Sequence, residues 1–201
     1  VFCPACPQLE INLPGDWKDL YNEDTVTLHY VVDGNFTAQH MKMMRPECDI
    51  ALADGLGYMV EDGPYQNHIS SAQRPKIHLK QKSSCQNHRT VNEANVNRSN
   101  LQATGIGATA CARHGCFVLH CVVDFNKGEQ QKSIDYSICQ ALSYNSTGIT
   151  KALIIYDVAC QWYVKFCRRV EACPALQIPD DMDIIPAVGK FHLNAHNLDC
   201  F

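Results

Sequence analysis

The stretch ALIIYDVACQW, residues Ala152–Trp162, decides which fold the sequence predicts. Its first five residues are four aliphatic side chains and a tyrosine. An apolar run of this kind is typical of a strand with both faces covered, as in the interior of a parallel sheet. Asp157 follows at once, at the carboxyl end of the strand, where open α/β sheets place functional groups. Because Asp also caps helices, Asp157 predicts a functional site only if the chain brings a partner to it.

A second strand ending in a carboxylate is predicted near the start of the chain. Thr25–Asp33 is rich in β-branched and aromatic residues, and its apolar residues alternate onto one face. Gly34 and Asn35 then indicate a turn, from which residues 36–43 are expected to return as an antiparallel strand. A hairpin turn around Asp33 with no chemical role is the alternative interpretation of this segment.

The remaining pattern predicts an alternation of strands and helices. We expect a strand at Phe117–Asp124, a helix at Ser133–Leu142, the strand at 152–157, a helix from Ala159 to about Val170, an acidic loop at 179–186 and a short strand at Ala187–Phe191. Three antiparallel strands followed by alternating helices and strands is the order of a ribonuclease H-like fold, an α/β (α+β) fold with a five-stranded mixed sheet and flanking helices.

That strand order predicts a metal site. The fourth strand lies beside and parallel to the first, so Asp157 is expected close to Asp33. Neighbouring carboxylates repel each other and are normally held ionised by a shared divalent cation. Mg²⁺ or Mn²⁺ in such a site suits phosphoryl transfer, because the cation activates the attacking oxygen and stabilises the leaving one.

Composition sets limits on the class of protein. The chain has 201 residues, 46% of them hydrophobic and 19% charged, as in a globular domain. No apolar run approaches the ~20 residues that a membrane span needs. The formal net charge of −4 speaks against a nucleic-acid-binding surface over the whole chain but leaves room for a local basic groove. The chain begins at Val1 without a signal segment and resembles a piece of a longer protein.

Twelve cysteines suggest metal ligands more than a disulfide framework. The spacing Cys85-x₂-His88-x₂₂-Cys111-x₂-His114 suits a closed tetrahedral zinc site. This site would cross-link residues 45–115, a segment with too little core pattern to order itself. We therefore predict a zinc-binding insertion at 45–115, between strands 2 and 3, within a core formed by residues 21–44 and 116–201. A secreted disulfide protein and a polar turn with unrelated thiols are the alternatives.

The two ends of the chain carry further candidate ligands. The N-terminal arm, residues 1–20, contains Cys3-x₂-Cys6. His192, His196 and Cys200 recur every four residues, as on one face of a short helix, and could form a second metal site closed by Cys3 or Cys6. Alternatively, His192 positions DNA or water near the acids, or the segment is a capped helix with buried histidines.

Seven motifs resemble those of the Kyakuja–Dileera–Zisupton (KDZ) transposases. In order, they are Cys3-Pro-Ala-Cys-Pro, Ile11-Asn-Leu-Pro, Asp33-Gly-Asn-Phe, Cys111-Ala-Arg-His-Gly, Lys127-Gly-Glu with Asp135-Tyr, Tyr156-Asp-Val-Ala-Cys-Gln-Trp, and Lys190-Phe-His-Leu-Asn-Ala-His. The resemblance implies a nuclear, ribonuclease H-like transposase of the Asp-Asp-Glu (DDE) type that cleaves and joins transposon-end DNA with Mg²⁺ or Mn²⁺. It also implies a zinc-binding insertion between the first two acids, which are Asp33 and Asp157.

The resemblance leaves the catalytic set incomplete. The family's third acid, a Glu on a later helix, would fall beyond Phe201, so we expect this portion alone to be inactive. Glu171 follows the second acid but sits at the far end of its helix. The alternative function is a domesticated or decayed, zinc-stabilised DNA- or protein-binding module. Whether the full-length protein forms a homo-oligomer stays open.

Overall fold

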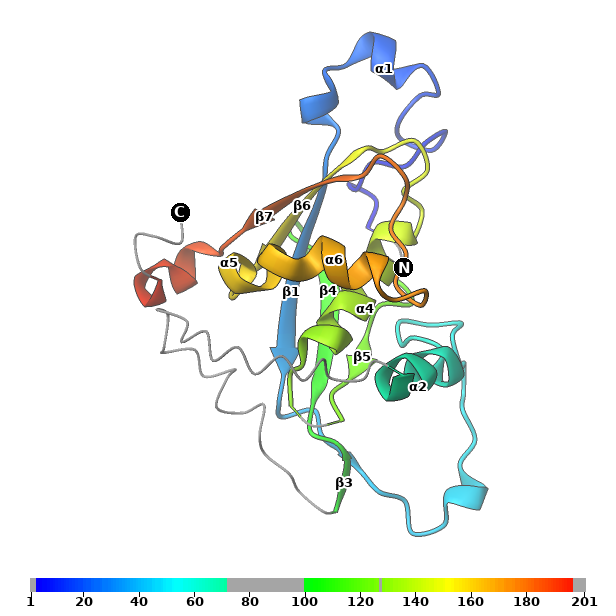
Figure 1. Ribbon diagram of the computed structural model, residues 1–201. Helices are drawn as coiled ribbons and strands as arrows, with labels where there is room; N and C mark the ends of the chain where they lie inside the picture. The colour runs from blue at the N-terminus through cyan, green and yellow to red at the C-terminus, as the bar shows by residue number, and fades with distance from the viewer. Residues whose placement is uncertain (1–2, 72–99, 127, 197–201) are drawn as a thin grey trace.

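The chain folds around one five-stranded mixed sheet (Figure 1). The computed structural model describes residues 3–71, 100–126 and 128–196. The strand order is β5-β4-β1-β6-β7, with bounds β5 Val123–Asp124, β4 Ile106–Cys111, β1 Leu28–Asn35, β6 Lys151–Tyr156 and β7 Asp183–Ala187. β4 runs antiparallel to β1 and to β5, whereas β1, β6 and β7 run parallel to one another. The predicted mixed α/β sheet is confirmed.

The predicted pairing of the first strand with the strand at 152–157 is also confirmed. β1 and β6 are parallel neighbours, and their register places Val32 opposite Tyr156. Both strands alternate buried with partly exposed residues, so one face of the pair is covered and the other is more open. The prediction that β6 is covered on both faces was therefore wrong, because Leu153 and Ile155 are only half-buried.

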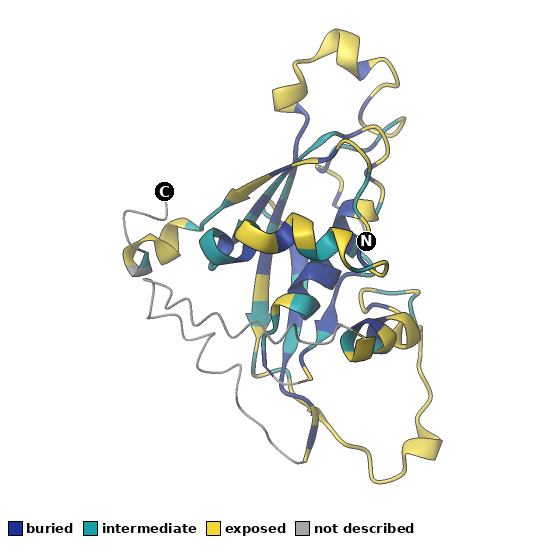
Figure 2. Cartoon of the chain, viewed as in Figure 1, coloured by how far each residue is buried: buried dark blue, intermediate teal, exposed yellow. Residues whose placement is uncertain are grey.

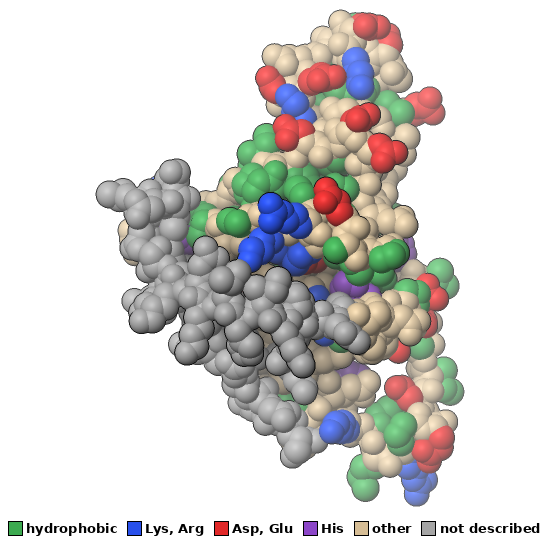
Figure 3. Space-filling view, viewed as in Figure 1, with side chains coloured by type: hydrophobic (Ala, Val, Ile, Leu, Met, Phe, Trp, Pro, Cys, Tyr) green, Lys and Arg blue, Asp and Glu red, His purple; other side chains and the backbone are tan. Residues whose placement is uncertain are grey.

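Helices cover the buried face of the sheet. Helix α4, Gln131–Ser143, packs on β4 and β5 and contains the predicted helix at 133–142. The predicted helix after Asp157 is a chain of three short pieces, α5 Ala159–Trp162, η3 Tyr163–Lys165 and α6 Phe166–Glu171. Figure 2 shows the buried residues gathered in the sheet and the helices' inner sides, while α6 exposes its outer side. Figure 3 shows Lys and Arg side chains gathered over α6.

A buried ion pair connects these helices. The Asp135 carboxylate on α4 is inaccessible to solvent and accepts hydrogen bonds from Trp162 Nε1 at 2.8 Å and from Arg169 Nε at 2.6 Å and Nη2 at 2.9 Å. Burial raises the pKa of Asp135, and Arg169 opposes this shift. The contact joins α4 to α5 and α6 through charge-assisted hydrogen bonds.

The strand that pairs with β1 is not the predicted one. β1 continues through Gly34 and Asn35, where a turn was expected, and its antiparallel partner is β4. The expected return strand at 36–43 is reduced to β2, His40–Met41, which pairs with β3, Leu101–Ala103, in a separate two-stranded sheet. β4 therefore joins the main sheet from within residues 45–115, the stretch predicted as the insertion.

The predicted strand at 117–124 was mostly wrong. Only Val123–Asp124 forms a strand, β5, and His120 has a positive φ of 58°. The reason lies in the backbone hydrogen bonds: the amides of His120, Cys121 and Val122 bond to the carbonyls of Gly57 and Tyr58. Residues 120–122 therefore pair with residues 57–58, while Phe117 forms only an isolated bridge to Ala110 of β4.

The last predicted elements were misplaced. The final strand, β7, occupies Asp183–Ala187, where an acidic loop was expected, and 187–191 is not a strand. β7 is an edge strand. Proline has no backbone N–H to donate, and an edge strand tolerates Pro186 because one of its sides has no partner strand in the sheet. Residues Lys190–Ala195 form a 3₁₀ helix, η4, so His192 and His196 do not share an α-helical face, and Cys200 lies outside the described residues.

Besides the β2–β3 pair, four helical elements complete the described chain: α1 Trp17–Leu20, η1 Glu23–Thr25, η2 Pro46–Cys48 and α2 Asp62–Ser71. In the part of the chain that the structure describes, every helix is too short or too polar to cross a lipid bilayer.

Candidate functional site

Asp33 and Asp157 lie side by side at the same edge of the sheet. Asp33 belongs to β1 and Asp157 directly follows β6. Since Val32 pairs with Tyr156, the next residue on each strand is one of the two acids. Neighbouring strands lie about 4.8 Å apart, so the two backbones approach closely there. Side-chain alternation directs Asp33 away from the buried Val32, onto the more open side of the sheet, and Asp157 follows β6 in a turn.

Local hydrogen bonds hold both acids. The amide of Gly34 donates to Asp33 Oδ1 at 2.7 Å. The carbonyl of Asp157 accepts from His196 Nε2 at 2.8 Å, and Cys160 Sγ lies 3.5 Å from His196 Nδ1. His196 therefore supports the backbone of Asp157, and its ring nitrogens face Asp157 and Cys160 instead of the N-terminal thiols. His192 is exposed.

Glu129 is a third carboxylate at this site, and the sequence analysis did not single it out. It directly precedes the N-cap of α4, and Tyr156 donates its hydroxyl proton to Glu129 Oε1. Burial raises the pKa of Glu129 to about 7; the Tyr156 hydrogen bond opposes the rise, and the charges of Asp157 and Asp33 add to it. These contributions place Glu129 within electrostatic reach of both predicted acids.

Gly34 makes room for Glu129. A Cβ at Gly34 would lie 2.9 Å from Glu129 Oε2 and 2.8 Å from the Phe125 ring, closer than real side chains approach. Asp33 therefore places a carboxylate on β1, and Gly34, which has no side chain, leaves space for the carboxylate of Glu129. The only signal for Glu129 in the sequence was the Lys127-Gly-Glu segment, which carried no functional assignment.

Asp33 and Asp157 carry the ligand atoms that a divalent cation needs, although the oxygens of Asp33, Asp157 and Glu129 are not all gathered within 4.8 Å of one another. Carboxylate oxygens are the ligands that Mg²⁺ and Mn²⁺ prefer. Without a cation, the negative charges repel one another, and the raised pKa of Glu129 reflects that repulsion together with burial.

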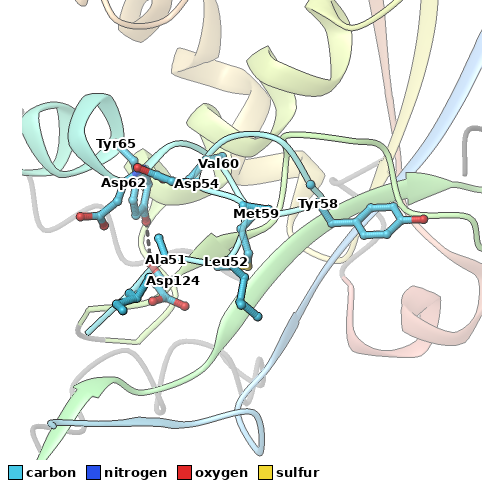
Figure 4. Close-up of a pocket in the computed structure, with 12 residues that line it drawn as sticks. Ala51, Leu52, Asp54, Tyr58, Met59, Val60, Asp62, Tyr65 and Asp124 are labelled. Carbon is cyan, nitrogen blue, oxygen red and sulfur yellow. Dashed lines mark hydrogen bonds between the residues drawn. The ribbon is translucent and has the colours of Figure 1, made fainter. Parts of the chain in front are cut away.

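A pocket in the described residues lies away from these acids (Figure 4). Residues 50–65 and Asp124 line it, with Leu52, Met59 and Val60 among the apolar side chains, and the volume is about 470 Å³. Tyr65 donates a hydrogen bond to the carbonyl of Asp124 at 2.6 Å, as the dashed line in Figure 4 shows. None of the three acids lines this pocket, so it is separate from the carboxylate site.

A second group of functional side chains joins the N-terminal arm to β4. The Sγ atoms of Cys3, Cys6 and Cys111 lie within 4.8 Å of one another, and all three residues are buried. His114 Nδ1 lies 3.6 Å from Cys3 Sγ and 3.7 Å from Cys111 Sγ. This group could bind a metal such as zinc. Cys85 and His88, predicted to complete the site with Cys111 and His114, lie outside the described residues.

A family model described as Kyakuja-Dileera-Zisupton transposase matches residues 26–201. The chain belongs to this transposase family. Searches among curated proteins and among solved structures found no match. Within this KDZ transposase chain, the matched residues contain the three acids together with Cys111 and His114, whereas Cys3 and Cys6 precede them.

Proposed function

We propose that this KDZ chain carries the catalytic acids of a DDE-type transposase with a ribonuclease H-like fold. The strand arrangement supports the fold: β1, β4 and β5 form the antiparallel half of the sheet, and β6 and β7 extend it in parallel on the other side of β1. The observation that carries the proposal is the placement of Asp33 and Asp157 on neighbouring positions of β1 and β6.

In the proposed mechanism, Asp33 and Asp157 would hold Mg²⁺ or Mn²⁺ where a DNA phosphodiester binds. When bound, the cation supplies an activated attacking oxygen and stabilises the leaving oxygen. Gly34 keeps Asp33 in place through its backbone amide, and His196 holds the backbone of Asp157. Glu129 lies within electrostatic reach of both acids, and burial raises its pKa to about 7, so that it is partly protonated near neutral pH.

DNA is the proposed partner and the nucleus the proposed location. The net charge of −4 requires phosphate contacts to be local, and the basic side chains gathered over α6, among them the exposed Arg168, offer one such surface (Figure 3). The exposed Arg113, whose Nε donates to His29 Nδ1 at 3.4 Å, offers a second basic contact.

Mn²⁺ binding tests the carboxylate site directly. We expect the chain to bind Mn²⁺ in calorimetric titration, and Asp33→Asn to weaken that binding by about tenfold or more, because the variant loses a charged oxygen ligand. Asp183→Asn, which removes an exposed acid at the opposite end of edge strand β7, is the matched control and should bind as the wild type does. Equal Mn²⁺ affinity in the Asp33 variant and the wild type would contradict a shared cation site and favour the non-catalytic binding module.

Replacing Glu129 should separate metal binding from stability. The folded-state pKa of about 7 exceeds the ordinary value of 4.5, so ionisation of Glu129 destabilises the metal-free protein as pH rises through that window. Glu129→Gln, which stays neutral, should raise Tm at pH 8, change it little at pH 4, and weaken Mn²⁺ binding. Glu47→Gln, at an exposed position in η2, serves as the control. A lower Tm at pH 8 with unchanged Mn²⁺ affinity would show that Glu129 is only a packing residue.

A further inference from the structure

We propose that Cys3, Cys6, Cys111 and His114 form a structural Zn²⁺ site that fastens the N-terminal arm to β4. The site joins a Cys-x₂-Cys turn that precedes the family-matched residues to a Cys-x₂-His turn within them. It takes its second ligand pair from the arm, not from Cys85 and His88. The proposal does not depend on the catalytic role of the acids.

The distances from His114 to two of the sulfurs match edges of a zinc tetrahedron. With Zn–S near 2.3 Å and Zn–N near 2.0–2.1 Å, tetrahedral geometry places a sulfur and a nitrogen ligand about 3.6 Å apart and two sulfurs about 3.8 Å apart. His114 Nδ1 lies 3.6 Å from Cys3 Sγ and 3.7 Å from Cys111 Sγ. The three sulfurs lie within 4.8 Å of one another, whereas His114 lies farther than that from Cys6, so the imidazole must move toward Cys6 Sγ for all four atoms to reach one ion.

Backbone hydrogen bonds shape both ligand turns. The amide of Cys6 donates to the carbonyl of Cys3 at 3.2 Å, and Asn12 Nδ2 donates to the carbonyls of Pro4 at 2.8 Å and Cys6 at 2.9 Å. On the other side, the amide of Gly115 donates to the carbonyl of Cys111 at 2.8 Å, and Gly115 adopts a φ of +65° that favours glycine. The ligand side chains therefore project from two hydrogen-bonded turns that face each other.

The surroundings supply an independent indication that the thiols are metal-bound thiolates. Tyr30 is the register partner of Cys111, and its side chain is fully buried. Within the described residues, its hydroxyl has no hydrogen-bond partner, which is costly for a buried donor. Zinc-bound thiolates accept hydrogen bonds, so formation of the site would place acceptors next to this hydroxyl.

The cluster has a structural role in the fold. Cys3, Cys6 and Cys111 form a small buried group of their own, apart from the main core, with Cys116 packed against it. β4 is the neighbour of β1, which carries Asp33. A zinc ion at this position would cross-link the arm to the central part of the sheet, as structural zinc does in small domains with little core.

Zinc analysis of purified variants tests the ligand set. We expect the Cys3→Ser/Cys6→Ser double variant to lose about one equivalent of zinc per chain relative to the wild type, and His114→Ala to bind that zinc more weakly. Cys116→Ser is the matched control, because Cys116 lies against the cluster without being assigned as a ligand. The Cys85→Ser/His88→Ala double variant should keep this equivalent. Loss of that zinc from the Cys85/His88 variant, or its full retention in the Cys3/Cys6 variant, would overturn the assignment.

Cobalt substitution of the wild-type chain keeps the proposal testable if a variant fails to fold. The Cys3/Cys6/Cys111/His114 set predicts Co²⁺ in tetrahedral coordination with three thiolates and one imidazole, read from the intensity of its thiolate charge-transfer bands. A two-thiolate spectrum would point to the Cys85/His88/Cys111/His114 set and contradict the proposal. Absence of a tetrahedral Co²⁺ spectrum, together with a Cys3–Cys6 disulfide detected by mass spectrometry, would contradict it as well.

Discussion

Asp157→Asn is expected to reduce DNA strand cleavage by the full-length transposase at least about 1000-fold. Asp157 lies beside Asp33 at the ends of two parallel strands, and the two share the proposed cation. A metal ion contributes several kcal/mol of stabilisation to a phosphoryl-transfer transition state, and each 1.4 kcal/mol is a factor of ten in rate. The measurement is cleavage of a duplex that carries the ends of the encoding element, with Mg²⁺ or Mn²⁺ present.

Two controls make this result specific. Zinc content should be unchanged in Asp157→Asn, because the thiol cluster lies on the arm and β4. Glu171→Gln, at an exposed position at the end of α6, should retain cleavage, because that residue is remote from the acids along its helices. Full cleavage by Asp157→Asn would contradict the proposed catalytic role of Asp157. Loss of cleavage in Glu171→Gln would show that the catalytic acids have been assigned wrongly.

Arg169→Met is expected to lower the free energy of unfolding by about 3–5 kcal/mol. Arg169 compensates the fully buried Asp135 carboxylate through two hydrogen bonds, and removing one partner of a buried pair leaves an uncompensated charge. Chemical denaturation at neutral pH measures the change. Arg168→Met, which alters the exposed neighbour, should stay within about 0.5 kcal/mol of the wild type.

A double variant tests the cause of that loss. In Asp135→Asn/Arg169→Met the buried group is neutral, and its amide oxygen can still accept from Trp162 Nε1. The double variant should therefore recover part of the stability that Arg169→Met loses. If the two substitutions only add their losses, the contribution of Arg169 is packing and not charge compensation.

The central strands could be predicted because their signals are local. β1 alternates apolar residues along the strand, β6 is an apolar run, α4 carries an apolar face, and the strand order then places Asp33 beside Asp157. β4 could not be predicted this way. Its sequence, Ile-Gly-Ala-Thr-Ala-Cys, is rich in small residues of low β-propensity. Those residues suit the position because a Cβ at Gly107 would lie 2.6 Å from the Phe125 ring, a long-range contact that the sequence does not display.

The two sites differ in how much of each was visible in the sequence. Asp33 and Asp157 each end a strand pattern in the sequence. Glu129 is placed by long-range contacts: it lies where a side chain at Gly34 would be, and it accepts a hydrogen bond from Tyr156. For the thiols, spacing identified the ligand pairs but not which pairs meet. Spacing favoured Cys85 and His88 as partners of Cys111 and His114, while the fold brings the arm's Cys3 and Cys6 to them.

Anomalous diffraction from a crystal of the chain soaked in Mn²⁺ tests the central claim most directly. The account predicts a manganese peak between the carboxylates of Asp33 and Asp157, within about 2.0–2.3 Å of an oxygen from each, with Glu129 turned toward it. The contradicting result is a pair of Asp33 and Asp157 carboxylates more than about 10 Å apart, or a site that stays without manganese at saturating Mn²⁺.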